Sequence, residues 1–246
     1  IRARRETHVS ELAIDAYARV LADADADPAF AAEVLSLPSE GFLAEQMAEV
    51  DPDAIHRARV DLRRRLAHAL NEDLHRAHAR FGGSGPYSPD AASAGRRALR
   101  NVCLGYLTEI DDPETRALAW RQFEQADNMT DSLAAMAALA QIDCEERSRA
   151  LERFYGRWKD EALVLDKWLA VQAGSRLPGT LAEVKRLMHH PVFDMKNPNK
   201  VRALISTFCH GNHLHFHAAD GSGYRFCADA VIALDALNPQ VAARLS

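Results

Sequence analysis

Apolar residues recur along the chain with the spacing of helix faces. Leu99, Val102, Cys103, Tyr106 and Leu107 follow the pattern i, i+3, i+4, i+7, i+8, which places them on one side of a helix. The same kind of spacing returns at positions 181, 184, 187 and 188 and at positions 201, 204, 205 and 208. Alanine and leucine dominate, while runs of valine, isoleucine and threonine are scarce. The pattern therefore predicts an all-α protein.

One longer segment carries a narrower apolar stripe. Leu62, Leu66, Leu70 and Leu74 are spaced four residues apart, as on a single helix face. The stripe predicts one continuous helix from about residue 51 to residue 81.

Dipeptides that end in proline mark the starts of several helices. Asp, Ser and Asn side chains cap helices, and proline fits the first helical turn. The caps of these dipeptides are Asp27, Asp51, Ser88, Asp112, Asn197 and Asn238. We expect a helix to begin directly after each of them.

The clearest interruption of the helical pattern is the segment 82–90, whose glycines and prolines cannot continue a helix.

In the second half of the sequence, predicted helix pairs of about 35 to 40 residues follow one another, as in helical-repeat proteins. We therefore expect an armadillo- or HEAT-like superhelix of stacked antiparallel helix pairs. We also expect residues 1–246 to form a single domain, with the segment 82–90 as a candidate sub-boundary.

Composition excludes several classes of protein. The chain has 35 acidic and 30 basic residues and a net charge of −5, which is opposite to the basic excess of nucleic-acid binders. No apolar run reaches the ~18 residues of a membrane span, and no signal-peptide pattern opens the chain. We expect neither nucleic-acid nor membrane partners. The four cysteines form no C-x-x-C pair, which favours reduced thiols in a cytoplasmic protein.

Motifs of catalytic centres are missing from the sequence. His75 and His78 are three residues apart, but the H-E-x-x-H motif of zinc peptidases does not occur. We interpret both histidines as solvated residues on a polar helix face. The G-x-S-x-G elbow of serine hydrolases is also absent. The segment from Asp220 to Gly223 lacks the lysine of a phosphate-binding loop, and its glycines predict a sharp reversal before a helix.

A second group of histidines leaves two interpretations open. His213, His215 and His217 alternate along the chain and follow His210. On one side of an extended segment, three imidazoles could bind zinc or nickel, with Asp220 as a further ligand. An ordinary polar turn is the interpretation that we prefer.

Two arginines near the carboxyl end are candidate binding residues. Arg202 borders the apolar stripe at positions 201, 204, 205 and 208, and Arg244 follows Val241 on a short final helix. A guanidinium at such a border can hold a carboxylate with two parallel hydrogen bonds. Most border arginines only pack or face solvent, so spacing alone does not assign a function.

Seven ordered segments resemble the C-terminal helical domain of bacterial aminopeptidase N (alanyl aminopeptidase), a zinc metallopeptidase of the gluzincin class. Together they run from about residue 35 to residue 245 and so cover most of the chain. The segments are LSLPSE (35–40), RALRNVCLGYL (97–107), QADNMTDSLAAMAAL (125–139), LVLDKWLAVQA (163–173), NPNKVRALI (197–205), FHAADGSGY (216–224) and NPQVAARL (238–245).

The resemblance implies that this chain is one non-catalytic domain of a four-domain enzyme that releases N-terminal residues from peptides. Zinc, its ligands and the glutamate base belong to a thermolysin-like catalytic domain of the same polypeptide. The helical domain closes over that active site and controls peptide access and positioning. The resemblance implies that Arg202, Arg244 and Gln240 bind the peptide substrate. It assigns no catalytic residue and no metal ligand to this chain.

The sequence departs from the family in two respects. Family members continue for a few more helices beyond the segment that contains Arg244, so we expect the final helices of the domain to be missing. Of the clustered histidines, only His217 fits the family pattern.

The chain begins at Ile1 without a methionine, which favours a part of a longer protein. The alternative is a stand-alone helical-repeat scaffold that binds peptides or proteins on its concave face.

Overall fold

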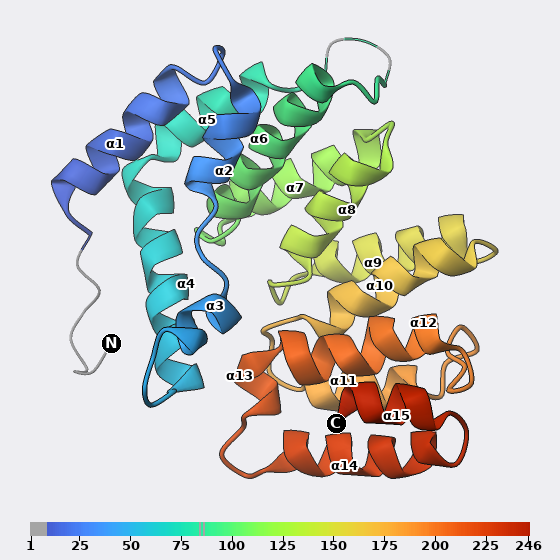
Figure 1. Cartoon of the computed structure of the whole chain (residues 1–246). Helices are drawn as coiled ribbons and strands as arrows, with labels where there is room; N and C mark the ends of the chain where they lie inside the picture. The colour runs from blue at the N-terminus through green and yellow to red at the C-terminus, as the bar shows by residue number, and fades with distance from the viewer. Residues whose placement is uncertain (1–8, 84, 86) are drawn as a thin grey trace. The chain divides into compact units, whose positions relative to one another are not determined.

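The computed structural model describes residues 9–83, 85 and 87–246 (Figure 1). These residues contain fifteen α-helices and one π-helix, and no strand occurs among them. None of the described helices is long and apolar enough to cross a membrane. The chain divides into two compact units, one up to Leu139 and one from Ala140 to Ser246. The segment 82–90 lies inside the first unit, and its residues 84 and 86 lie outside the described residues.

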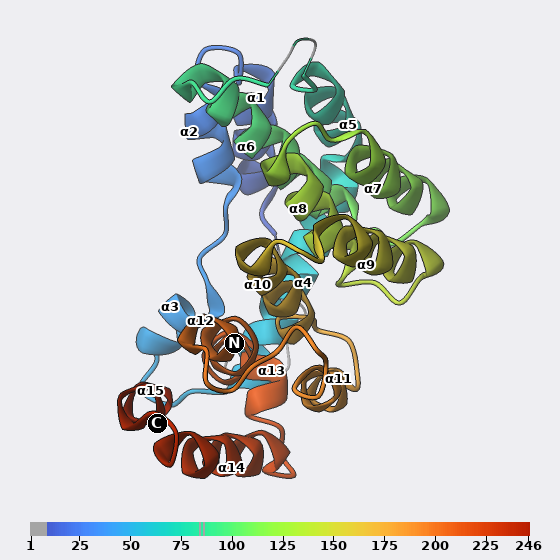
Figure 2. The ribbon, with the colours of Figure 1, turned by 90° about the vertical axis from the view of Figure 1, so that its right-hand side faces the viewer.

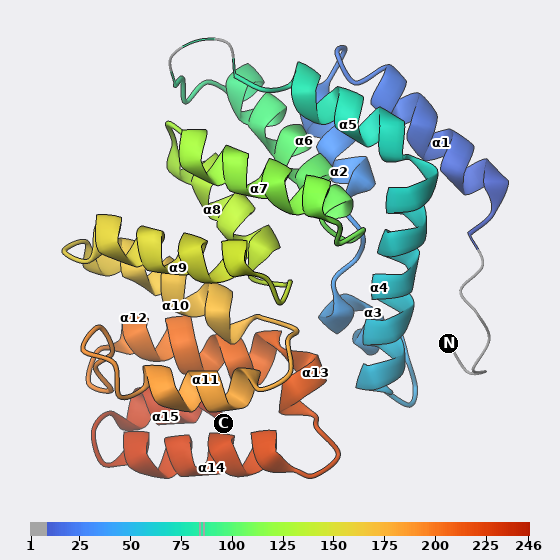
Figure 3. The same ribbon diagram turned by 180° about the vertical axis from the view of Figure 1, so that it is seen from behind.

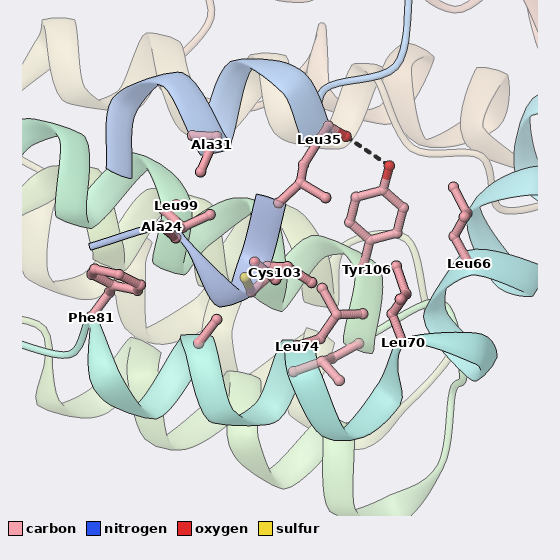
Figure 4. Close-up of a cluster of buried hydrophobic side chains, with 14 of the residues drawn as sticks. Ala24, Ala31, Leu35, Leu66, Leu70, Leu74, Phe81, Leu99, Cys103 and Tyr106 are labelled. Carbon is pink, nitrogen blue, oxygen red and sulfur yellow. Dashed lines mark hydrogen bonds between the residues drawn. The ribbon is translucent and has the colours of Figure 1, made fainter. Parts of the chain in front are cut away.

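The described residues of the first unit form eight α-helices. They are α1 (Glu11–Ala22), α2 (Pro28–Leu35), α3 (Glu40–Glu45), α4 (Pro52–Ala69), α5 (Asn71–Arg80), α6 (Ala91–Leu107), α7 (Pro113–Gln125) and α8 (Met129–Leu139). Its apolar core gathers side chains from α2, α4, α5 and α6, including Leu35, Leu74 and Cys103 (Figure 4). The hydroxyl of Tyr106 donates to the carbonyl of Leu35 at 2.7 Å, so this buried phenol is satisfied.

The predicted helix from residue 51 to residue 81 is in fact two helices. The break lies at Leu70, which has non-helical dihedral angles (φ −107°, ψ 17°) between α4 and α5. Leu66, Leu70 and Leu74 are nevertheless all buried in one core, as their spacing predicted. The turn changes the direction of the chain without interrupting the apolar stripe, which is why the sequence pattern did not reveal it.

Proline-marked helix starts are confirmed with one exception. The side chains of Asp27, Asp51, Asp112, Asn197 and Asn238 each accept a hydrogen bond from the backbone N–H groups of the helix that follows. At the sixth start the cap is Asp90, so α6 begins two residues later than Ser88 and Pro89 predicted. Asp90 accepts hydrogen bonds from the backbone N–H and the hydroxyl of Ser93, and a further one from the hydroxyl of Ser88.

A chain of buried polar groups links α5, α6, α7 and α8. The Nε2 atom of His78 lies 2.8 Å from Oε1 of Gln122, whose amide nitrogen donates to Asn101 Oδ1 at 2.7 Å. Asn101 in turn donates to Asp131 at 2.9 Å, and Arg100 pairs with the same carboxylate at 3.2 Å. The solvated interpretation of His78 is therefore wrong, since only 6% of this residue is exposed. Burial lowers the pKa of His78 to about 4.

The second unit contains seven α-helices and the π-helix. They are α9 (Glu145–Trp158), α10 (Ala162–Ala173), α11 (Thr180–Leu187), α12 (Pro198–Val201), η1 (Arg202–Gly211), α13 (His213–Phe216), α14 (Ser222–Asp235) and α15 (Pro239–Leu245). Figure 2 shows two layers of this unit from the side, with α10, α12 and α15 in one layer and α9 and α11 in the other. Figure 3 shows the unit from the side of α9 and α11.

Candidate functional site

Arg202 begins a ten-residue π-helix that continues directly from α12. Val201, Leu204, Ile205 and Phe208 are fully buried along this segment, as their spacing predicted. The π-helical winding was not predicted, because this apolar spacing does not distinguish it from an α-helix. One contributing bond is local, since the hydroxyl of Thr207 donates to the carbonyl of Arg202 at 3.2 Å. π-Helical turns are rare and often lie at functional sites.

The Arg202 side chain is exposed, and within the described residues no hydrogen bond or ion pair is found for its guanidinium. Lys200, two residues earlier, has the opposite environment. Only 5% of Lys200 is exposed, and its Nζ atom lies 2.8 Å from Asp166 Oδ1. Sequence reasoning missed this buried lysine. Its spacing with Leu204 and Phe208, at i, i+4 and i+8, was the available signal.

Gln240 and Arg244 lie on α15, the last helix. They are four residues apart and so project from the same side of this short helix, and both are exposed. Ala242 and Leu245 are buried on its other side. The carbonyl of Leu245 lies 3.3 Å from Nε2 of His210 at the far end of η1. The structure thus brings Gln240 and Arg244 together, whereas Arg202 lies on a separate element of the same unit.

Two glycines shape the turn that leads into α14. Gly221 has a positive φ of 69° and is the N-cap residue of this helix. Gly223 is needed for a different reason, because a Cβ atom there would lie 2.1 Å from the carbonyl oxygen of Phe216. The predicted sharp reversal is present, and the close approach of two backbone segments adds a second constraint.

The clustered histidines lie around a short helix, so the structure does not have the extended segment that the alternative metal-site interpretation required. α13 contains His213 and His215, and Nδ1 of His217 lies 2.7 Å from the hydroxyl of Tyr224. The rings of His213 and His217 meet edge to face, with centroids 5.7 Å apart. Burial, together with His213, lowers the pKa of His217. In the part of the chain that the structure describes, no group of three or more His, Cys, Asp or Glu side chains is placed to hold a metal ion.

A groove of about 730 Å³ lies between α9, α10 and α11. Its base includes the rings of Tyr155 and Trp168, whose centroids are 5.2 Å apart. On α11, Arg186 donates two hydrogen bonds to Glu183, at 2.6 and 2.8 Å. His190 meets Tyr155 edge to face at 5.1 Å. Arg186 and Glu183 are thus paired with each other, and sequence reasoning did not identify the groove.

Comparison with known proteins relates the chain to one part of longer aminopeptidases. A family model described as a domain of unknown function with ARM repeats (DUF3458_C) matches residues 1–246. Aminopeptidase N of Caulobacter vibrioides is 45% identical over 231 residues, which are 94% of this chain and 27% of that protein. Aminopeptidase N of Escherichia coli is 40% identical over 234 residues, which are 94% of this chain and 26% of that protein.

A solved structure gives the same result. The crystal structure of Legionella pneumophila aminopeptidase A in complex with aspartic acid has a TM-score of 0.88 and 34% sequence identity. The match covers 98% of this chain and 29% of that chain. This chain therefore spans about a quarter of the length of the curated relatives named above. The predicted all-α, armadillo-like fold is confirmed. The chain belongs to the DUF3458_C family of ARM-repeat domains, and its predicted resemblance to the C-terminal helical domain of bacterial aminopeptidase N is confirmed.

Proposed function

We propose that this domain forms a wall of the peptide chamber of a zinc-dependent aminopeptidase and controls which peptides reach the active site. The catalytic domain of the same polypeptide would hold the zinc ion and supply the hydrolytic chemistry. This chain's own residues would bind and orient the peptide. The proposal is supported by the aminopeptidase N relatives, which are 36–45% identical over at least 94% of this chain.

Within this domain, we assign peptide binding to Arg202, Arg244 and Gln240. The observation that carries the assignment is the exposed Arg202 guanidinium, which has no internal partner among the described residues and is attached to a π-helix whose apolar face is buried. A guanidinium presented in this way can donate two parallel hydrogen bonds to the free carboxylate of a short peptide. Arg244 and Gln240 add a second set of donors on one side of α15.

Such contacts would act on binding more than on the chemical step. The carboxyl-terminal end of a tripeptide lies away from the bond that is cleaved, so its contacts position the substrate. Charge-assisted hydrogen bonds contribute about 1.5–3 kcal/mol, and exposure to solvent reduces that value. We therefore expect a contribution near the lower limit, which corresponds to about a tenfold change in binding.

The test uses the full-length enzyme and two substrates. Arg202→Ala should raise KM for a tripeptide about tenfold and leave kcat/KM for a chromogenic single-residue amide nearly unchanged. Arg121→Ala, which removes an exposed arginine of α7, is the matched control and should change neither value. Equal losses on both substrates would indicate a folding defect. An unchanged KM for the tripeptide would refute the assignment of Arg202.

A further inference from the structure

Lys200 is a buried cation in a position that helix electrostatics does not favour. Its Nζ atom donates to the carbonyl of Ala162 at 2.7 Å and lies 2.8 Å from Asp166 Oδ1. Ala162 is the first residue of α10, and the amino-terminal end of a helix repels positive charge. Burying an ammonium group is also costly unless it is paired. The Ala162 carbonyl accepts a hydrogen bond from the ammonium group and the Asp166 carboxylate balances its charge, and together they fix where Lys200 can lie.

The pair attaches the start of η1 to the first turns of α10. Lys200 lies in α12, and η1 begins two residues later without an intervening loop. Leu204 and Ile205 of η1 are fully buried. The backbone that carries Arg202 is therefore held by an ion pair on its amino-terminal side and by apolar packing on its carboxyl-terminal side.

A second bond acts on the backbone of Arg202 itself. The hydroxyl of Thr207 donates to the Arg202 carbonyl from five residues further along the chain. This spacing matches the i to i+5 hydrogen bonds of the π-helix, so the side chain reinforces the wide winding. The carbonyl of Arg202 is thereby fixed while its guanidinium remains exposed.

We propose that Lys200, which is buried and forms an ion pair with the partly buried Asp166, is a positioning residue that fixes the backbone from which Arg202 reaches the peptide. The inference rests on the proposed function of Arg202 and adds the residues that orient it. A buried ion pair is often no more stabilising than apolar residues of similar size. A defined position for the π-helix is therefore the effect that we assign to this pair.

Kinetics on the full-length enzyme test the positioning role. Lys200→Met keeps the length of the side chain and removes its charge, and it should raise KM for a tripeptide about fivefold while kcat for a chromogenic single-residue amide is unchanged. In an Arg202→Ala background the same substitution should add less than about 1.5-fold, because the residue that it positions is already absent. An equal rise in both backgrounds would overturn the proposal.

Two milder variants test the same role if the Lys200→Met protein does not fold. Asp166→Asn keeps the shape of the ion-pair partner and removes its charge. It should raise the tripeptide KM by about half of the logarithmic change expected for Lys200→Met. Lys200→Arg retains the charge and should restore most of the binding. Lys167→Met removes an exposed lysine of α10 and serves as the matched control, with no expected change. A normal KM in folded Lys200→Met and Asp166→Asn proteins would overturn the proposal.

Hydrogen exchange separates this inference from the proposed function. In the full-length protein, Lys200→Met and Thr207→Val should each raise the rate of amide hydrogen exchange in residues 202–211 at least threefold. Arg202→Ala should leave that rate unchanged. If Arg202→Ala leaves the tripeptide KM unchanged but Lys200→Met accelerates exchange, the proposed function fails and the anchoring of η1 stands. If exchange in η1 is unchanged in Lys200→Met, the positioning role fails even where Arg202→Ala weakens binding.

Discussion

A buried polar network in the first unit and two exposed arginines in the second unit show two different uses of polar side chains. In the first unit, Asp131 and His78 are buried, and both belong to one hydrogen-bonded chain. In the second unit, Arg202 and Arg244 are exposed, and among the described residues no partner is found for either guanidinium. Buried polar groups must be satisfied within the fold, so their networks report on stability. An exposed charge on a fixed helix costs the fold little and is available to another molecule.

Asp131→Ala should give the largest change in unfolding free energy, and it tests whether the buried network stabilises the fold. The substitution leaves Arg100 and Asn101 without their carboxylate acceptor in a buried environment. Breaking a buried pair of this kind costs about 3–5 kcal/mol of unfolding free energy. Urea unfolding measures the loss, with the exposed Asp127→Ala as control, for which a change within about 0.5 kcal/mol is expected. A loss below 1 kcal/mol for Asp131→Ala would contradict the structural role.

Gly223→Ala sharpens the comparison in the second unit. The new methyl group would meet the Phe216 carbonyl oxygen, which belongs to the backbone and cannot rotate away. We expect a loss of about 3 kcal/mol or more in unfolding free energy. Gly156→Ala in α9 is the matched control, because its added Cβ would meet no atom within 4 Å apart from its chain neighbours and the nearby backbone of its own helix. That variant should gain about 0.5–1 kcal/mol through helix propensity, and equal effects at both glycines would refute the close approach.

Acidification should destabilise the first unit through His78. The folded-state pKa of His78 is lowered to about 4 from 6.5, so the unfolded chain binds more protons between these values. The stabilising contribution of neutral His78 is fully present above pH 6.5 and is lost as the pH falls towards 4, by about 3 kcal/mol. Urea unfolding at pH 7.5 and pH 4 measures the loss. His78→Gln does not titrate, so its unfolding free energy should depend less on pH by this amount.

The smallest effects on stability are expected at the proposed binding residues. Arg202→Ala and Arg244→Ala remove exposed side chains and should each change the unfolding free energy by no more than about 0.5 kcal/mol. Thermal unfolding followed by circular dichroism measures both variants against the unaltered chain. A loss above 1.5 kcal/mol would show that these arginines stabilise the fold, which would remove the contrast between the buried network and the exposed arginines.

Several features of the fold could be predicted because they depend on neighbours in the sequence. The apolar stripe around Leu204 and Phe208 is buried, and Asp27 and Asp112 cap their helices. A cap and a helix face both involve residues within a few positions of each other, so local spacing is sufficient. The resemblance to a known family added Arg202, Gln240 and Arg244, which spacing alone did not distinguish from ordinary surface residues.

The sequence by itself determined which segments are helical, where most helices begin and which faces are apolar. Only the tertiary structure decided which polar residues are buried. His78 lies inside because Gln122, 44 positions away, offers an acceptor. Lys200 lies inside because another helix supplies the Ala162 carbonyl as an acceptor and the Asp166 carboxylate as a counter-charge. The physical reason is that burial of a polar group depends on partners that the chain brings together only on folding, and that information is not carried by local spacing.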